Sequence, residues 1–314
     1  MVARCVGLGS YGLAKDNLAE LCQIDLSPTT IGKIADGTAG EIAVRLENNP
    51  ADVRRHFQRA QGEIEFYSDG TFVHIRNADG TTEWREFKLG AYAKRQRSAS
   101  ALPSEWATRN LLKPSVVYAF AAIMDKEEFQ GLCHTMRRCW GVGGVSSALG
   151  DGAKWIGNVN LAVNGKTDEC LDIYHGAEHI SDCGKILFGV PQDSKDWFER
   201  MRLVLLSEGF AGMRRELQAL ENELKGKSNK SKRESVEALR KYLGGHSERL
   251  NYCERLAAGR AIGSGLIEGA CKNLVGKRLK QTGACWRLPR ANRIAALCAV
   301  LYSHQWKIAW NTTH

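Results

Sequence analysis

Apolar residues along the chain change their spacing, and each spacing predicts a different kind of element. From Asn17 to about Leu46 the apolar positions recur with helical spacing, and Ser27 and Pro28 are placed to begin a second helix after a short turn. The pattern therefore predicts two helices joined by a turn. A helix-turn-helix that reads a DNA groove has this outline, and so do helical pairs that only pack together.

Between Gly62 and Arg97 the pattern becomes alternating, with aromatic and β-branched residues on both sides of a turn at 77–80. We expect two antiparallel strands here, at about 63–76 and 82–94, joined by a hairpin turn. Similar reasoning predicts further elements downstream: strands at 116–123, just before Asp151 and at 170–174, and helices at 126–140 and from 176 onward.

The second half of the chain is predicted to be mainly helical. Residues 193–254 are rich in charge, and a polar stretch at 225–232 predicts an exposed turn between two helices. From 257 to 310 the apolar residues return at helical spacing. These patterns predict an α/β fold with flanking helices. The expected units are a helical N-terminal unit (1–59), the first part of the core (60–192), a helical insertion (193–256) and the basic C-terminal helices of the core (257–314).

Composition and charge exclude several classes of protein. The 314 residues are 43% hydrophobic and 25% charged, which is typical of a globular protein. No apolar run reaches the length of a membrane span, so we expect no membrane partner and a cytoplasmic location. Ten cysteines without a CxxC pair predict reduced thiols. Residues 251–314 hold ten Lys or Arg against two acids, which predicts a surface that binds a polyanion such as a nucleic acid.

Three acids from distant segments are candidates for one acidic site. Asp69 lies in the middle of a predicted strand, Asp151 lies between two glycines at a strand end, and Glu268 is the only acid after Glu254. A carboxylate among apolar neighbours requires a metal ion, a partner or a turn. Three carboxylates can hold a pair of divalent cations for phosphodiester chemistry, although surface or turn acids would show the same pattern.

The segments around these acids resemble a known family. YSDGTFV with WREFKLG, then GDGAKWI, LDIYHGAEH and GSGLIEGACKNLVGKRLKQTGACW, are similar to bacterial insertion-sequence transposases of the IS-Kra type, in family order from about 62 to 286. The resemblance implies an RNase H-like mixed sheet and a DDE triad of Asp69, Asp151 and Glu268. These residues would hold two Mg²⁺ ions, or Mn²⁺, for DNA strand cleavage and strand transfer.

The resemblance also implies supporting residues and partners. Asp172 and His175 match a DxxH signature, and we expect them to brace the site or to contact DNA near it. The implied partners are transposon ends and target DNA, bound by a homodimer or a higher synaptic oligomer that associates with the nucleoid. Basic residues near Glu268 are expected to hold the DNA backbone: Lys272, Lys277, Arg278, Lys280, Arg287, Arg290 and, extending the track, Arg293.

Two other hypotheses fit parts of the sequence. A DNA-binding protein without catalysis, such as a regulator or an inactive transposase remnant, would show the same basic surface. His175 and His179 are four residues apart and could bind Zn²⁺ on one helical face, but Glu178 is not where the HExxH motif of metalloproteases needs it. Divalent-metal-dependent DNA cleavage and stoichiometric zinc are the observations that separate these hypotheses.

Overall fold

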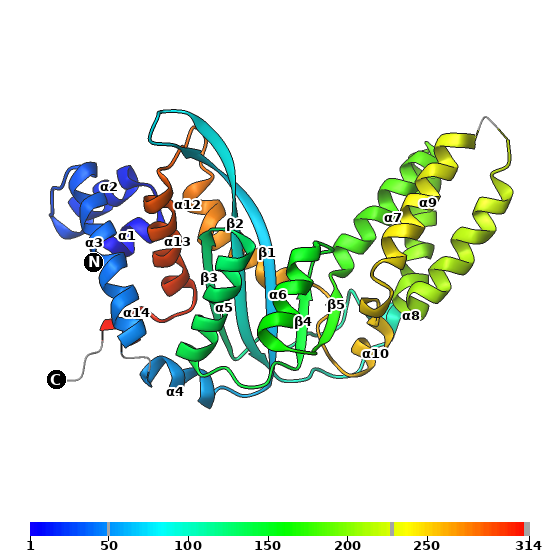
Figure 1. Cartoon of the computed structure of the whole chain (residues 1–314), viewed down its shortest axis with the longest axis horizontal. Helices are drawn as coiled ribbons and strands as arrows, with labels where there is room; N and C mark the ends of the chain where they lie inside the picture. The colour runs from blue at the N-terminus through cyan, green and yellow to red at the C-terminus, as the bar shows by residue number, and fades with distance from the viewer. Residues whose placement is uncertain (49–50, 227–228, 311–314) are drawn as a thin grey trace.

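The computed structural model describes residues 1–48, 51–226 and 229–310 (Figure 1). Within these ranges the chain forms one mixed five-stranded sheet with the order β3-β2-β1-β4-β5. Strands β1 to β3 are antiparallel neighbours, whereas β4 and β5 run parallel to β1. The predicted α/β class is therefore confirmed. The strands are β1 (Glu63–Arg76), β2 (Thr82–Arg95), β3 (Val116–Ile123), β4 (Ser147–Gly150) and β5 (Asp168–Leu171).

The β1–β2 hairpin is confirmed as predicted, with β2 ending one residue later. Its turn is closed by Asp79 Oδ1, which accepts hydrogen bonds from Thr81 N at 2.9 Å and Thr81 Oγ1 at 2.6 Å. Gly80 adopts a φ of 89°, a conformation that favours glycine. Because β4 pairs only with residues 65–68 and β3 only with residues 87–94, the distal half of the hairpin extends past the other strands.

Helices cover both faces of the sheet. One face packs against α5 (Lys126–Trp140) and α6 (Lys154–Asn164) through an aromatic cluster in which the Tyr118 and Trp140 ring centroids are 5.1 Å apart. Helix α5 was predicted, whereas α6 was not. The other face is covered by the C-terminal elements: α11 (Gly265–Ala270), a π-helical turn (Cys271–Gly276), α12 (Lys277–Leu279), α13 (Leu288–Tyr302) and α14 (Trp306–Trp310).

The N-terminal helices pack on α13 (Figure 1). Ser27 Oγ accepts a hydrogen bond from Thr30 N at 3.2 Å, so the second predicted helix begins where its sequence indicated. Ile31 and Ala35 of this helix are buried, whereas Ile34 is 38% exposed. The helices of this group are α1 (Val2–Leu8), α2 (Tyr11–Cys22) and α3 (Pro28–Asn48). Helix α4 (Ala51–Arg59) packs instead against α5.

Three long helices form an arm that extends away from the sheet (Figure 1). They are α7 (Ile173–Phe188), α8 (Pro191–Glu223) and α9 (Lys230–Gly244), and α10 (Tyr252–Ala257) leads back to the core. The predicted charged helical pair corresponds to α8 and α9, and residues 227–228 of its predicted turn lie outside the described ranges. The strand predicted at 170–174 ends earlier, because Asp172 Oδ1 accepts a hydrogen bond from Tyr174 N at 3.0 Å and begins α7.

A buried arginine joins α10 to the sheet. Arg255 is 1% exposed, and its guanidinium donates to Asp168 Oδ2 at 2.6 Å and to Ser147 Oγ at 2.7 Å. It also donates to the Ala261 carbonyl oxygen at 2.8 Å. One side chain thus links the first residues of β4 and β5 to the segment that returns from the arm. In the part of the chain that the structure describes, no helix combines the length and the apolar character needed to cross a bilayer.

Replacing Arg255 with Ala is expected to lower the free energy of unfolding by about 3–5 kcal/mol, because Asp168 and Ser147 lose their buried partner. Urea denaturation followed by circular dichroism measures this loss. Arg215→Ala is the matched control, since Arg215 also makes several hydrogen bonds to acids, but on the exposed surface of α8. This substitution is expected to leave the urea midpoint nearly unchanged. Equal effects of the two substitutions would contradict the linking role of Arg255.

Candidate functional site

Strand register brings three aspartates to one end of the sheet. Ser68 of β1 pairs with Gly150 of β4, and Gly150 pairs in turn with Leu171 of β5. The three strands are parallel and about 4.8 Å apart, so the residues that follow this row lie side by side. Each of these following residues is acidic: Asp69, Asp151 and Asp172.

Helix α11 and the π-helical turn bring a fourth acid to the same place. Ser264, the residue before α11, donates a hydrogen bond from Oγ to Asp172 Oδ2 at 2.6 Å. Cys271, after α11, donates from Sγ to Asp69 Oδ2 at 3.2 Å. Glu268 lies on the helix between these two contacts. The structure therefore gathers the three acids expected to form a triad, and it adds Asp172, which was expected only to support them.

Burial and the charges of neighbouring acids raise the pKa values of two of these acids. Burial raises the pKa of Asp69, the hydrogen bonds from Cys271 and from the Gly70 backbone oppose this rise, and the negative charges of the neighbouring aspartates add to it. Partial desolvation also raises the pKa of Glu268, and the charges of Asp172 and Asp69 raise it further. Burial raises the pKa of the Cys271 thiol, which keeps it protonated as the donor to Asp69.

The acidic cluster, defined as Asp69, Asp151, Asp172 and Glu268, has no basic partner. Among the ion pairs of the described residues, none involves these four side chains, and Asp172 is only 4% exposed. Carboxylate oxygens without a counter-ion are the ligands that Mg²⁺ and Mn²⁺ prefer, so the donor set fits a hard divalent cation. In the described ranges, no three His, Cys, Asp or Glu side chains are already arranged around a common metal position.

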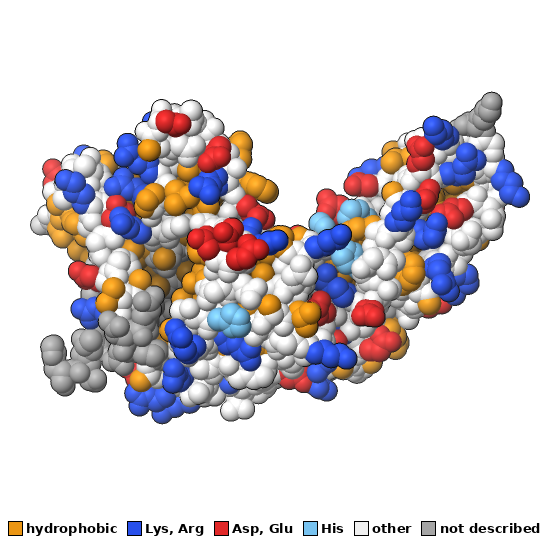
Figure 2. Space-filling model, viewed as in Figure 1, with side chains coloured by type: hydrophobic (Ala, Val, Ile, Leu, Met, Phe, Trp, Pro, Cys, Tyr) orange, Lys and Arg blue, Asp and Glu red, His pale blue; other side chains and the backbone are white. Residues whose placement is uncertain are grey.

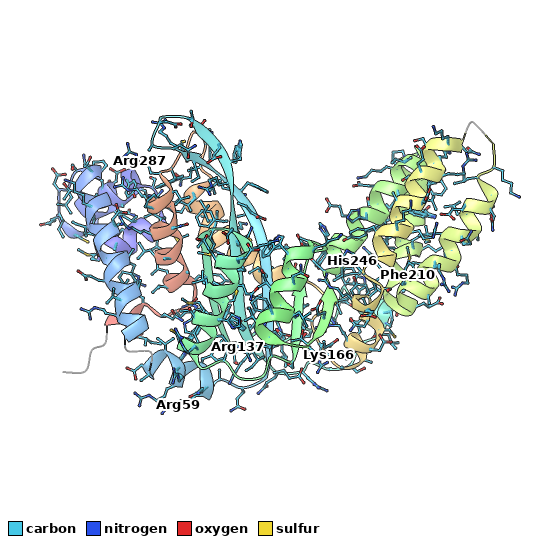
Figure 3. The ribbon with its side chains drawn as sticks, in the orientation of Figure 1. Arg59, Arg137, Lys166, Phe210, His246 and Arg287 are labelled. Atoms are coloured by element: carbon cyan, nitrogen blue, oxygen red, sulfur yellow. The ribbon has the colours of Figure 1, made fainter. Side chains whose placement is uncertain are left out.

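The arm touches the acidic cluster at the residues next to Asp151. Arg249 donates a hydrogen bond from its guanidinium to the Asp151 carbonyl oxygen at 3.1 Å. A Cβ atom at Gly152 would lie 2.8 Å from His246 Nε2 and 2.9 Å from Tyr242 Oη, so glycine is needed for this approach. His246 lies at the base of the arm (Figure 3). The insertion thus packs against the backbone that carries one of the acids.

Three histidines and a tyrosine form a cluster on the inner side of the arm. The rings of His179 and Tyr242 are 3.7 Å apart, and those of His175 and His179 are 5.4 Å apart in an edge-on arrangement. Burial lowers the pKa of His179 and of His246, so both imidazoles favour the neutral form. Figure 2 shows histidine side chains near the base of the arm, facing the hollow between the arm and the core. His175, which was predicted to support the site, lies in this histidine cluster on α7, three residues after Asp172.

Most of the basic residues predicted to bind DNA lie on the surface. Lys277 donates to Asn273 Oδ1 at 2.8 Å, and Lys280 reaches Thr71 Oγ1, two residues beyond Asp69 on β1. Arg290 is paired with Asp36 at 2.9 Å. The exposed residues of the predicted set are Lys272, Lys277, Lys280, Arg287, Arg290 and Arg293.

The prediction that Arg278 contacts DNA is wrong in this structure. Arg278 is 3% exposed, and its Nε donates to the Val6 carbonyl oxygen at 3.0 Å. Its guanidinium lies 4.5 Å from the ring centroid of Tyr11 and 4.9 Å from that of Trp286. This burial could not be predicted from the local sequence, because the aromatic partner Tyr11 comes from the distant N-terminal unit. Arg278 attaches the N-terminal helices to the C-terminal part of the core.

Two neighbouring cavities beside the distal half of β1 are lined by basic residues. One, of about 830 Å³, lies between β1 and the 279–285 loop and begins at Gly70 and Thr71. The other, of about 720 Å³, is lined by Arg287, Arg290 and Arg293. The two cavities share Arg76 and the segment 283–285. Sequence analysis missed Arg76, whose position near the hairpin turn gave no indication that the C-terminal loop packs beside it.

No protein-family model matches the chain, and no curated protein matches it. The four clustered acids and the adjoining basic cavities are therefore the observations from which a function is inferred.

Replacing Asp69 with Asn is expected to raise the thermal unfolding midpoint of the metal-free protein at neutral pH by a few degrees. The raised pKa of Asp69 means that its ionised form is less favourable in the folded than in the unfolded chain. This penalty is present above the raised pKa and is lost as the pH falls toward the ordinary value of 3.8. Differential scanning fluorimetry in EDTA, at neutral pH and near pH 4, measures the gain and its loss.

Asp79→Asn is the control for this prediction. Hydrogen bonds from Thr81 lower the pKa of Asp79, so its ionised form is favoured in the folded chain and the substitution is expected to give no gain. If Asp69→Asn has the same unfolding midpoint as the unaltered chain at neutral pH, the raised pKa of Asp69 is contradicted. A gain in midpoint that grows as the pH falls would contradict it as well.

Proposed function

We propose that this chain is a DNA transposase that cleaves and joins DNA strands at the acidic cluster. The observation that carries the proposal is the convergence of Asp69, Asp151 and Glu268, which are distant in sequence, beside a basic cavity. The mixed five-stranded sheet with helices on both faces is compatible with an RNase H-like core. The blocks that resemble IS-Kra type transposases contain these same three acids.

The chemistry follows from what carboxylates without counter-ions can hold. Cleavage of a phosphodiester requires an activated nucleophile and stabilisation of the charge on the leaving oxygen. Two Mg²⁺ or Mn²⁺ ions, when bound by Asp69, Asp151 and Glu268, supply both. Cys271 orients the Asp69 carboxylate through its hydrogen bond. The same site would serve the second step, in which the freed 3′-hydroxyl attacks target DNA.

Asp172 positions the surrounding elements. Its Oδ1 accepts a hydrogen bond from Tyr174 N and begins α7, while its Oδ2 is held by Ser264 at the start of α11. One buried carboxylate therefore fixes the first turn of the arm relative to the helix that carries Glu268. Its charge also adds to the repulsion that a bound cation would relieve.

The basic surface supports DNA as the substrate. Lys280 lies against Thr71 beside the acidic cluster, and Arg76, Arg287 and Arg293 line the cavities that lead away from it. Arginine and lysine set against phosphates position a strand without regard to its sequence. We assign sequence recognition or contacts between subunits to the N-terminal helices, within a homodimer or a higher synaptic oligomer that joins transposon ends to target DNA.

Asp151→Asn is expected to reduce DNA cleavage by at least about 100-fold while DNA binding is retained, since one charge-stabilising group is lost at the reacting centre. The assay is nicking and strand transfer on a plasmid that carries the DNA flanking this gene, with Mg²⁺, with Mn²⁺ or with EDTA. Asp182→Asn, an exposed acid on α7 paired with Lys185, is the matched control and should cleave as the unaltered chain does.

The outcomes of this assay are distinct. Full cleavage by Asp151→Asn would remove Asp151 from the mechanism. Salt-sensitive binding by the unaltered chain, with no cleavage under any metal condition, would replace the transposase proposal with that of a non-catalytic DNA-binding protein.

The double substitution Arg287→Ala and Arg293→Ala is expected to weaken DNA binding uniformly across sequences and to flatten its salt dependence. Each lost phosphate contact reduces the slope of log K against log salt by about 0.9, so the expected reduction is about 1.8. Fluorescence anisotropy at several salt concentrations measures the slope. Arg200→Ala serves as the control because Arg200 pairs with Glu216 on the arm. If the double substitution leaves the salt slope unchanged, as the control does, this surface is excluded from DNA binding.

A further inference from the structure

Two exposed aromatic rings lie together on the distal half of the β1–β2 hairpin. His74 of β1 and Trp84 of β2 are register partners, with ring centroids 5.2 Å apart and an angle of 24° between their planes. Trp84 is 66% exposed and the nearby Phe72 is 54% exposed. A tryptophan that leaves most of its surface in water marks a binding surface more often than a packing position.

This ring pair borders a cavity beside the distal half of β1. The cavity of about 830 Å³ is lined by Gly70 and Thr71, which follow Asp69 on β1, and by His74, Trp84 and Arg76. Its opposite wall is the 279–285 loop, which is held against β1 because Trp286 N donates to the His74 carbonyl oxygen at 3.0 Å. The second cavity shares Arg76 with the first and is also lined by Arg287 and Arg293. Aromatic rings and arginines thus line two neighbouring cavities.

Figures 2 and 3 show the surroundings of the hairpin. Hydrophobic side chains are exposed along the hairpin, at the edge of the hollow that faces the arm (Figure 2). Arg287 lies on the opposite side of the hairpin, toward the N-terminal helices (Figure 3).

We propose that His74 and Trp84 form a stacking site for an unpaired DNA base on the strand that is cleaved at the acidic cluster. This inference rests on the proposed function and adds to it a single-stranded segment as the ligand of the hairpin. Charge and shape select this ligand, because phosphates match Arg76, Arg287 and Arg293, while an exposed ring pair offers a face to one base. Inside a duplex both faces of a base are already covered by its neighbours.

The strand geometry locates the base relative to the cleavage position. His74 is five residues after Asp69 on β1, and a strand rises about 3.3 Å per residue, so the two positions are about 17 Å apart. Because the offset is odd, the two side chains leave β1 on opposite faces, so a bound strand would pass round the edge of β1 that no other strand pairs with beyond Ser68.

The test compares single-stranded with duplex DNA. The probe is a mixed-sequence 20-nucleotide strand with one 2-aminopurine, free or paired with its complement, and binding is measured in EDTA so that cleavage cannot intervene. Trp84→Leu is expected to weaken single-strand binding by about 5- to 100-fold and to abolish the quenching of 2-aminopurine fluorescence. Its affinity for duplex DNA is expected to stay within about 2-fold of that of the unaltered chain. Trp84→Phe keeps an aromatic face and should restore most of the binding.

Controls separate stacking from hairpin stability. Leu203→Ala removes an exposed apolar side chain from α8, on the arm, and should bind both probes as the unaltered chain does. Circular dichroism and the unfolding midpoint of Trp84→Leu show that the hairpin remains folded. Equal losses for single-stranded and duplex DNA, or quenching that persists in Trp84→Leu, would overturn the stacking site.

The failure of this inference is distinguishable from the failure of the proposed function. If Trp84→Leu binds single-stranded DNA as the unaltered chain does, the stacking site is refuted. If Asp151→Asn also abolishes DNA cleavage, the transposase proposal stays intact. The absence of any DNA binding by the unaltered chain would refute both.

Discussion

The gathering of four carboxylates without counter-ions is the constraint on which the rest of this structure depends. They occupy one end of the sheet without a basic partner among the described residues, and burial, together with the charges of neighbouring acids, raises the pKa values of Asp69 and Glu268. Folding alone would not favour such an arrangement, since each charge opposes the others. Strand pairing fixes the positions of the three aspartates. Under the proposed function a divalent cation would relieve the repulsion, so the cost in stability would be linked to metal binding.

The surrounding elements hold this arrangement in place at several independent points. The β1–β4–β5 register sets three of the acids, and Ser264 and Cys271 attach the segment that carries Glu268. Arg249 and Gly152 connect the arm to the loop of Asp151. These contacts come from both halves of the chain, and the arm packs against the backbone next to Asp151.

Local patterns in the sequence were sufficient for much of the fold. Alternation and the 77–80 turn predicted the hairpin, and Ser27 marked the start of α3. The strand predicted at 170–174 was too long, because the Asp172 side chain begins α7 while its neighbours continue the apolar run of a strand. Glu268 and Asp69 could be selected only through a family resemblance, since spacing along a chain does not show which acids meet. Long-range packing also decided the burial of Arg278, whose partners lie at the other end of the sequence.

The most direct test of the central claim is anomalous diffraction from crystals of this chain grown with Mn²⁺ and a DNA strand. The account predicts Mn²⁺ peaks coordinated by oxygens of Asp69, Asp151 and Glu268, with the DNA backbone beside them. Mn²⁺ bound only elsewhere, with these carboxylates free of metal while DNA is present, would contradict it.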